Sequence, residues 1–372
     1  MSPEYICRYE NAGVVMDLQE FVRNDSLFDS RLLLPNVWGG QGNNQSFRFL
    51  TPFFRVNGFM GKQTLISEIV AFDLDDFGTY LSRLPEDTHM IRHDTTQNLF
   101  SALYPFFHNE LFSHDSGGFQ FKRDEFLRLL SFCEERGTRP YTDSTPIARQ
   151  FQKNETLLLS ETIKNYEIFL CYAEYFGGDV GYMGAPGFNN GMPVVESDQY
   201  YGISAETKIP DAAWMFLKFL LSADIQDRYD TGEISGDLMP VLQSSFDAMI
   251  KTGYERYVNG TSMRNNLYSD SEYEQEAERI MEKVDAMTSG KDFDRSSEIR
   301  PPAFPFTEKE TAQVFRNIIS SAHTVPLWNP DVQKIVFEEL EAFFSGQKSK
   351  EECMEILEDR LRTYTTENTK FS

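Results

Sequence analysis

The last third of the chain carries the pattern that most constrains its fold: two helical segments joined by a tight turn. Residues 337–344 read F-E-E-L-E-A-F-F and lead into the turn Gly346-Gln347. Ser349 follows at an N-cap position, and Glu352 stands three residues later, as a capping box requires. Apolar side chains then recur at helical spacing, at Cys353, Ile356, Leu357 and Leu361. The pattern predicts a helix, a turn and a second, capped helix.

Size and charge limit the class of protein. With 372 residues the chain is too long for one simple core and fits two lobes. Hydrophobic residues make up 40% and charged residues 25%, which is typical of a globular protein rather than a disordered one. The net charge of −23 would repel a nucleic-acid backbone, and no basic stripe offsets it. We therefore expect no nucleic-acid partner.

Neither a metal site nor a cofactor is predicted. The four cysteines are far apart and pair with no histidine, which favours free buried thiols: Cys7, Cys133, Cys171 and Cys353. His89 and His93 are four residues apart, but no third ligand follows at a usual spacing. Asp73 opens a sequence similar to a calcium loop, yet Leu84 stands where that loop needs glutamate.

Membrane and secretion signals are also missing from the sequence as given. The longest apolar stretch, residues 212–223, is interrupted by Lys218 and is shorter than the roughly 18 residues expected of a membrane-spanning helix. The first residues do not have the pattern of a signal peptide.

Hydrophobic periodicity predicts the main elements. Helices are expected at residues 17–21, 75–84, 95–107, 122–136, 210–221 and 244–251, the fourth of them burying Phe126, Leu129, Leu130 and Cys133. Strands are expected at residues 180–183 and 199–204. A resemblance to the strands of a family described below adds 47–54 and 151–159, the latter with Asn154 in a left-handed turn. Such an order of strands and helices indicates an α/β fold.

Several segments, in order, resemble the extracellular solute-binding proteins, which are the capture subunits of ABC sugar importers. The similar segments are Y-E-N-A-G-V-V-M-D-L at 9–18, F-Q-K-N-E-T-L-L-L at 151–159, Y-G-I-S at 201–204, A-W-M-F-L-K-F-L-L at 213–221 and F-F-S-G-Q-K-S-K-E-E at 343–352. The resemblance covers most of residues 1–365 and is to the maltose-binding-like branch of the family.

The resemblance implies a two-lobed, periplasmic-binding-protein-like α/β fold of type II. One lobe would combine residues 1–55 with 200–250, and the other 56–199 with 300–372, while 251–299 would form a charged helix and a linker. In the family, three strands and two helices precede the segment that resembles residues 9–18. The first lobe is therefore expected to be incomplete in this chain.

The implied function is capture of a sugar or oligosaccharide between the lobes and its delivery to ABC permease subunits, without catalysis. The resemblance further implies an extracellular, cell-surface or periplasmic lipoprotein that acts as a monomer. Its only membrane attachment would be a lipid anchor that, like the signal peptide, is not present in this chain. Two alternatives stay open: a glycoside hydrolase-like α/β enzyme, which needs a pair of carboxylates, and a non-functional fragment of a binding protein.

Sugar sites combine aromatic rings with carboxylates and amides, and four segments of the sequence offer such residues. Trp38 lies in the Gly-rich segment 36–44, where a ring has no evident core role, and we expect it to contact ligand. Tyr200 and Tyr201 alternate on an expected strand, so one of them can face the ligand. Trp214, by contrast, stands at a core spacing within its helix.

The remaining candidates follow two expected strands. In maltose-binding-like relatives the segment that matches 160–165 faces the ligand, which implicates Glu161, Thr162 and Asn165, although a helix cap explains them almost as well. The Gly/Pro loop 184–191, with Phe188 and Asn189, follows a strand at an edge where α/β proteins bind ligands, but a plain surface turn is the alternative.

Overall fold

The computed structural model describes residues 13–38, 47–70, 72–86, 88–92, 94–115, 118–137, 150–151, 153–187, 189–228, 238–259, 306–324 and 330–368. Its helices are α2 (Gln19–Asn24), η1 (Ser30–Leu32), α3 (Pro35–Trp38), α4 (Gln63–Ile69), α5 (Leu74–Leu81), α6 (Thr96–Leu111), α7 (Arg123–Arg136), α9 (Tyr166–Tyr175), η3 (Asn189–Gly191), α10 (Pro210–Leu220), α11 (Ala223–Gln226), α12 (Gln243–Val258), α14 (Glu308–Ser321), α15 (Pro330–Phe344) and α16 (Lys350–Asn368). Its strands are β1 (Phe53–Lys62), β2 (His89–Ile91), β3 (Phe112–Asp115), β4 (Gly118–Phe121), β5 (Thr156–Ile163), β6 (Val180–Met183), β7 (Val194–Glu196), β8 (Met239–Pro240) and β9 (His323–Thr324).

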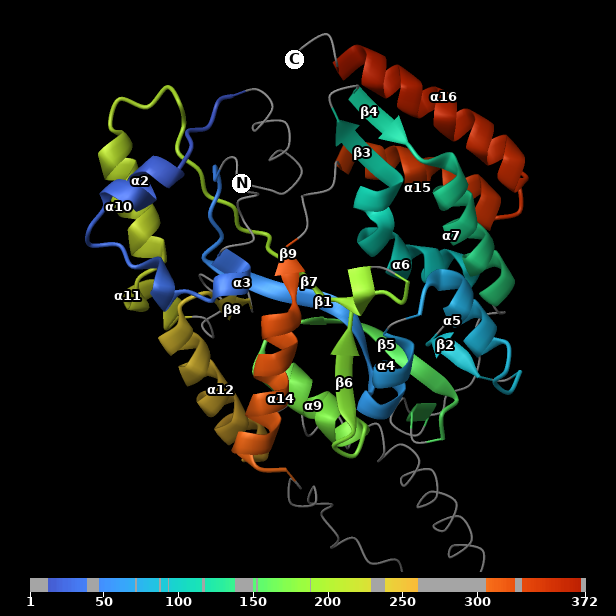
Figure 1. The fold of residues 1–372 in the computed structure, drawn as a ribbon, viewed down its shortest axis with the longest axis horizontal. Helices are drawn as coiled ribbons and strands as arrows, with labels where there is room; N and C mark the ends of the chain where they lie inside the picture. Colours follow the sequence, from blue (N-terminus) through green and yellow to red (C-terminus); the bar gives the residue numbers. More distant parts are fainter. Residues whose placement is uncertain are drawn as a thin grey trace, which may run out of the picture.

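The long strand β1 organises the main sheet. One of its edges pairs antiparallel with β5, and the other pairs antiparallel with β7 and then β6. Strand β8 pairs antiparallel with Phe53 and Phe54 at the start of β1. Strand β2 extends the sheet parallel to β5, and β9 extends it parallel to β7. Strands β3 and β4 form a separate hairpin. Figure 1 shows β1 crossing the middle of the molecule, with α2 and α10 towards one end and α6, α7, α15 and α16 towards the other.

The two faces of the sheet serve different cores, because successive side chains of a strand point to opposite sides. Val56 and Met60 of β1 join a core formed with α9, α10, α12 and α14. Phe59 points the other way, into a core formed with α4, α5, α6, α7, α15 and α16. The first core also takes in side chains from residues 18–50, so it draws on sequence from both of the expected lobes. The expected division of the chain into lobes, and the expected incompleteness of the first lobe, stay predictions.

Local sequence signals are confirmed where they act over a few residues. Ser349 and Glu352 form both hydrogen bonds of the expected capping box, at 2.8 and 3.2 Å. Gly346 ends α15 at φ 72°, and Asn154 adopts the expected left-handed conformation at φ 59°. The four expected core residues of α7 are buried. Most expected helices form within a few residues of their expected bounds, and α12 extends beyond residue 251 to Val258.

Three expectations are wrong. The strand expected at 47–54 begins only at Phe53, since Pro52 has no N–H to donate to a ladder. Residues 199–204 form no strand but two isolated bridges, of Tyr201 with Leu50 and of Ser204 with Val15. Ile356 is 36% exposed, because the face that α16 buries carries only Cys353, Met354, Leu357 and Leu361.

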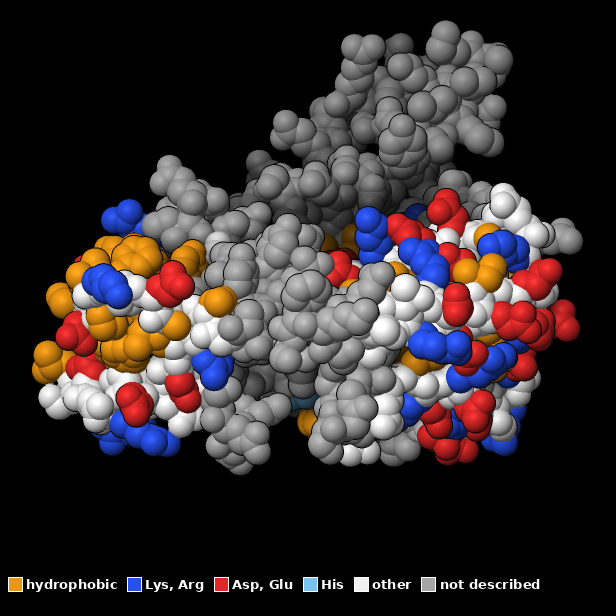
Figure 2. Space-filling model, turned by 90° about the horizontal axis from the view of Figure 1, so that it is seen from above, with side chains coloured by type: hydrophobic (Ala, Val, Ile, Leu, Met, Phe, Trp, Pro, Cys, Tyr) orange, Lys and Arg blue, Asp and Glu red, His pale blue; other side chains and the backbone are white. Residues whose placement is uncertain are grey.

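The surface of the molecule differs between its two ends. Acidic and basic side chains are interspersed on the end that carries α7, α15 and α16, whereas hydrophobic side chains gather on the end that carries α2 and α10 (Figure 2). Within the part of the chain that the structure describes, none of the helices combines the length and apolar composition of a membrane crossing. Cys133, Cys171 and Cys353 are free and buried, as expected, and Cys7 lies outside the described residues.

Candidate functional site

One face of β1 is apolar at both ends and polar in the middle. Phe53 and Phe59 are fully buried on this face, and between them stand Arg55 and Asn57, which are half-buried. Polar side chains in the middle of the longest strand have no place in a hydrophobic core, because burying them without partners is costly. This polar interval marks the candidate site.

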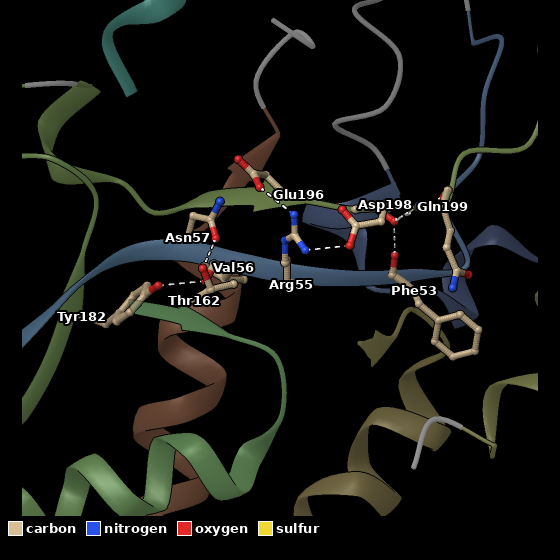
Figure 3. Close-up of polar contacts among 10 residues, drawn as sticks. Phe53, Arg55, Val56, Asn57, Thr162, Tyr182, Glu196, Asp198 and Gln199 are labelled. Atoms are coloured by element: carbon tan, nitrogen blue, oxygen red, sulfur yellow. Dashed lines mark hydrogen bonds and ion pairs between the residues drawn. The ribbon is translucent and has the colours of Figure 1, made fainter. Parts of the chain in front are cut away.

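Arg55 holds two carboxylates. Its Nη1 lies 2.7 Å from Oδ2 of Asp198, and its Nη2 lies 3.5 Å from Oε2 of Glu196 (Figure 3). The register that pairs Arg55 with Glu196 places both side chains on the same face of the sheet. Two acids around one guanidinium leave the cluster with an excess negative charge.

Burial raises the pKa of two groups at this cluster, Glu196 and Tyr200. The pKa of Glu196 is raised, chiefly because burial disfavours its charged form, while Arg55 and a hydrogen bond from Asn57 oppose the shift. Burial likewise raises the pKa of Tyr200, and the charge of Glu196 adds to the rise. Asp198 is 55% exposed and so remains accessible as a hydrogen-bond acceptor. The cluster therefore presents a positively charged hydrogen-bond donor, Arg55, and carboxylate acceptors, Glu196 and Asp198, on one surface.

Thr162 joins this face from the neighbouring strand β5. It pairs with Asn57 in the register, and its hydroxyl donates to Oδ1 of Asn57 at 2.7 Å. The structure therefore brings the predicted Thr162 together with Arg55, Asn57 and Glu196 (Figure 3).

Glu161 lies on the other face. It pairs with Gly58, which stands between Val56 and Met60 on the face of β1 that contributes to the first core. Its Oε2 accepts a hydrogen bond from the Tyr172 hydroxyl of α9 at 2.6 Å. The hydroxyl of Tyr182 also donates to the main-chain oxygens of Glu161 and Val56, at 2.6 and 2.8 Å. The structure thus separates Glu161 from Thr162, although they are adjacent in sequence.

Asn165 is the N-cap of α9. Its Oδ1 accepts a hydrogen bond from the main-chain N–H of Ile168 at 3.0 Å, which is the helix-cap alternative considered above. Phe188 lies outside the described residues. Asn189 begins η3, and its side chain is outside the described part of the structure.

The predicted aromatic residues pack against the core. The ring of Trp38 lies 4.8 Å from that of Phe47 and 5.5 Å from that of Phe28, so it has a packing role that the Gly-rich sequence around it did not suggest. Tyr201 is half-buried against the same core. Tyr200 packs beside Val15 and Phe49, next to the carboxylate cluster. The buried Trp214 confirms the expectation that it is a core residue.

Sequence reasoning missed Arg55, Asn57, Glu196 and Asp198. The available signal was the alternation R-V-N within the apolar sequence 53–60, with E-S-D at 196–198. The strand expected at 47–54 ends before this alternation begins. Among the described residues, no group of three or more His, Cys, Asp or Glu side chains is placed to hold a metal ion.

Comparison with known protein structures identifies the fold of this chain. No protein-family model matches the sequence, and no curated protein matches it. Among solved structures, an extracellular solute-binding protein family 1 member from Alicyclobacillus acidocaldarius subsp. acidocaldarius DSM 446 is similar at a TM-score of 0.51 and 11% identity, over 96% of this chain and 81% of that one. A protein from Synechococcus sp. MITs9220, described as a candidate oligosaccharide periplasmic-binding protein, is similar at a TM-score of 0.50 and 12% identity, over 98% and 84%. The chain therefore has the fold of the extracellular solute-binding proteins.

Proposed function

We propose that this protein captures a sugar or oligosaccharide outside the cell and delivers it to the permease of an ABC importer. The observation that carries the proposal is the cluster of Arg55, Asn57, Thr162, Glu196 and Asp198 on one face of the central sheet. Sugar hydroxyls both donate and accept hydrogen bonds, and charged groups form the stronger of these bonds. A guanidinium flanked by two carboxylates supplies both kinds of partner.

The fold supports the same proposal. The structural relatives are named as solute-binding proteins, and one of them as a candidate oligosaccharide-binding protein. In our proposal the ligand contacts are the five residues of the cluster together with Tyr200, whose ring can cover an apolar sugar face. The six contacts expected at Trp38, Glu161, Asn165, Phe188, Asn189 and Tyr201 stay predictions.

Replacing Arg55 with alanine should weaken ligand binding about tenfold or more. A hydrogen bond to a charged group contributes roughly 1.5–3 kcal/mol, and about 1.4 kcal/mol corresponds to a tenfold change in affinity. Glu196→Gln, which preserves the shape and removes the charge, should also weaken binding. The measurement is calorimetric titration of an oligosaccharide library against the wild type and both variants, with folding checked by circular dichroism.

The matched control is Arg316→Ala. Arg316 also pairs with a carboxylate, Asp247 at 2.8 Å, but it lies on α14 and is largely exposed. Its removal should leave binding unchanged. A ligand that binds wild type, Arg55→Ala and Glu196→Gln equally well would show that the cluster is not the site.

The enzyme alternative rests on one observation, the raised pKa of Glu196 beside a second carboxylate, since a glycosidase acid has this property. We expect no turnover of nitrophenyl glycosides above the buffer rate. Glu196 and Asp198 are both paired with Arg55, whereas the two carboxylates of a glycosidase stand on either side of the glycosidic bond. Saturable hydrolysis that disappears in Glu196→Gln would make the protein an enzyme.

A further inference from the structure

Helix α10 is apolar on two opposite faces. Trp214, Leu217 and Leu220 are buried on the inner face. On the outer face Met215, Phe216 and Phe219 are 66, 54 and 47% exposed. A surface helix ordinarily carries polar residues on its outer face, and a helix that is apolar all round is normally covered on both sides. The outer face of α10 therefore has the composition of an interface.

This outer face is held firmly in place. Oδ2 of Asp25 accepts a hydrogen bond from Nε1 of Trp214 at 2.8 Å and lies 2.5 Å from Nζ of Lys218. These bonds lower the pKa of Asp25 to about 2, so the carboxylate stays ionised under ordinary conditions. The ring of Phe28, which follows α2, also lies 5.3 Å from that of Trp214. The inner face thus anchors α10 to the α2 segment, and the outer face is a fixed surface.

The exposed side chains are spaced to receive another helix. Ile209, which is 67% exposed, starts a series that continues with Ala212, Phe216 and Phe219, at intervals of three, four and three residues. This alternation of three and four is the seam along which two helices pack. Met215 lies beside this seam. Helix α10 is at the end of the molecule where hydrophobic side chains gather on the surface (Figures 1 and 2).

The charges at the two ends of the seam are complementary to each other. Lys208 is exposed just before α10, and Asp224 is exposed just after it, in α11. In an antiparallel pair of α10 helices with its two-fold axis near Met215 and Phe216, Lys208 of each copy lies towards Asp224 of the other. The two helix dipoles are then antiparallel, which is the favourable arrangement for helices side by side. A two-fold interface needs a surface that is complementary to itself. The apolar seam with Lys208 before it and Asp224 after it meets this need, although Glu206 and Asp211 are also exposed near Lys208.

The size of the exposed apolar surface also fits contact with a second copy of this chain. At their exposures, Ile209, Met215, Phe216 and Phe219 present roughly 450 Å² of apolar area, taking about 150–250 Å² for a fully exposed large side chain. A stable interface buries about 800 Å² on each partner, of which the apolar centre is a part. Leu27, 89% exposed in the segment that packs against α10, can add to the rim. The patch is of the size expected for the centre of a dimer interface.

We infer that α10 is the interface of a homodimer, in which two copies of this chain pack their α10 helices antiparallel through Ile209, Phe216 and Phe219. The monomer expected from the family resemblance is the opposite outcome, and the test below distinguishes the two. It concerns the end of the molecule that carries α10 and does not depend on the proposed sugar site.

The first test is the mass of the protein in solution, measured by sedimentation and by light scattering over a broad range of concentrations. Wild type should have twice the mass of one chain. Phe216→Glu should have the mass of a single chain, because it places a charge in the apolar centre. The control Ile356→Glu changes an exposed apolar side chain on α16 and should remain dimeric. A wild type that is monomeric throughout, or a dimer that Phe216→Glu leaves intact, would overturn the inference.

The second test concerns the antiparallel arrangement. Lys208→Glu should weaken the dimer, and adding Asp224→Lys to it should restore the dimer, because the exchanged charges again face each other. Met215→Cys, near the two-fold axis, should form a disulfide between copies under mild oxidation, whereas Ile356→Cys should not. Failure of the charge exchange to restore the dimer, or of Met215→Cys to crosslink, would rule out this arrangement.

Discussion

Phe315→Ala should lower the free energy of unfolding by about 3–5 kcal/mol, the cost typical of removing a large buried ring. Phe315 lies on α14 and is fully buried. Its ring centroid lies 4.9 Å from that of Tyr166, 5.3 Å from that of Phe169 and 5.8 Å from that of Phe246. Because no small movement of three helices can fill the space of a phenyl ring, the variant would retain a cavity.

The measurement is denaturant unfolding of wild type, Phe315→Ala and the control Gln313→Ala. Gln313 is exposed on the same helix and should change stability by less than about 0.5 kcal/mol. Phe315 joins α9, α12 and α14, which come from distant parts of the sequence, so its loss should weaken the whole first core. Equal stability of the two variants would mean that these helices do not pack through Phe315.

Gly184→Ala should destabilise the protein by about 1–3 kcal/mol or more, although it adds a single methyl group. A Cβ at this position would lie 2.1 Å from the main-chain oxygen of Met192 and 2.8 Å from its carbonyl carbon. Both atoms belong to the backbone and cannot move aside as a side chain could. The hydrogen bond from the Gly184 N–H to the oxygen of Gly191, 2.7 Å long, would have to break or shift.

The matched control is Gly78→Ala, in the middle of α5. A Cβ there would meet only side-chain atoms at ordinary distances of 3.6 Å or more, and alanine is a better helix former than glycine. We therefore expect a gain of roughly 0.5–1 kcal/mol. The two alanine substitutions should move the unfolding midpoint in opposite directions. A shift of the same sign and size would contradict the close approach of Gly184 to the backbone of Met192.

Elements defined by neighbours in sequence could be predicted. The C-terminal helical pair follows from Ser349, Glu352 and Gly346, which act on backbone groups within four residues. The left-handed turn at Asn154 and the buried stripe of α7 follow for the same reason. The fold class was also correct, because the order of these elements together with the motifs resembles one family of binding proteins.

The strand boundaries could not be predicted from the sequence. The backbone of Tyr201 exchanges two 2.9 Å hydrogen bonds with Leu50, so the segment 199–204 makes isolated bridges with distant residues instead of joining the sheet. Trp38 packs against Phe28 and Phe47, which the glycines around it in sequence could not reveal. In each case the partner is a residue far along the chain or on another element.

The candidate site depends on tertiary structure for the same reason. Sequence established the helical pair, the chemistry of each side chain and the class of fold, since these depend on local pattern and composition. The pairing of Arg55 with Glu196, 141 residues away, was decided by the register of β1 and β7. The register of β1 and β5 likewise sent Thr162 to the polar face and Glu161 to the helix α9. A shift of one residue in either register would exchange the two faces, and no local pattern in the chain determines that choice.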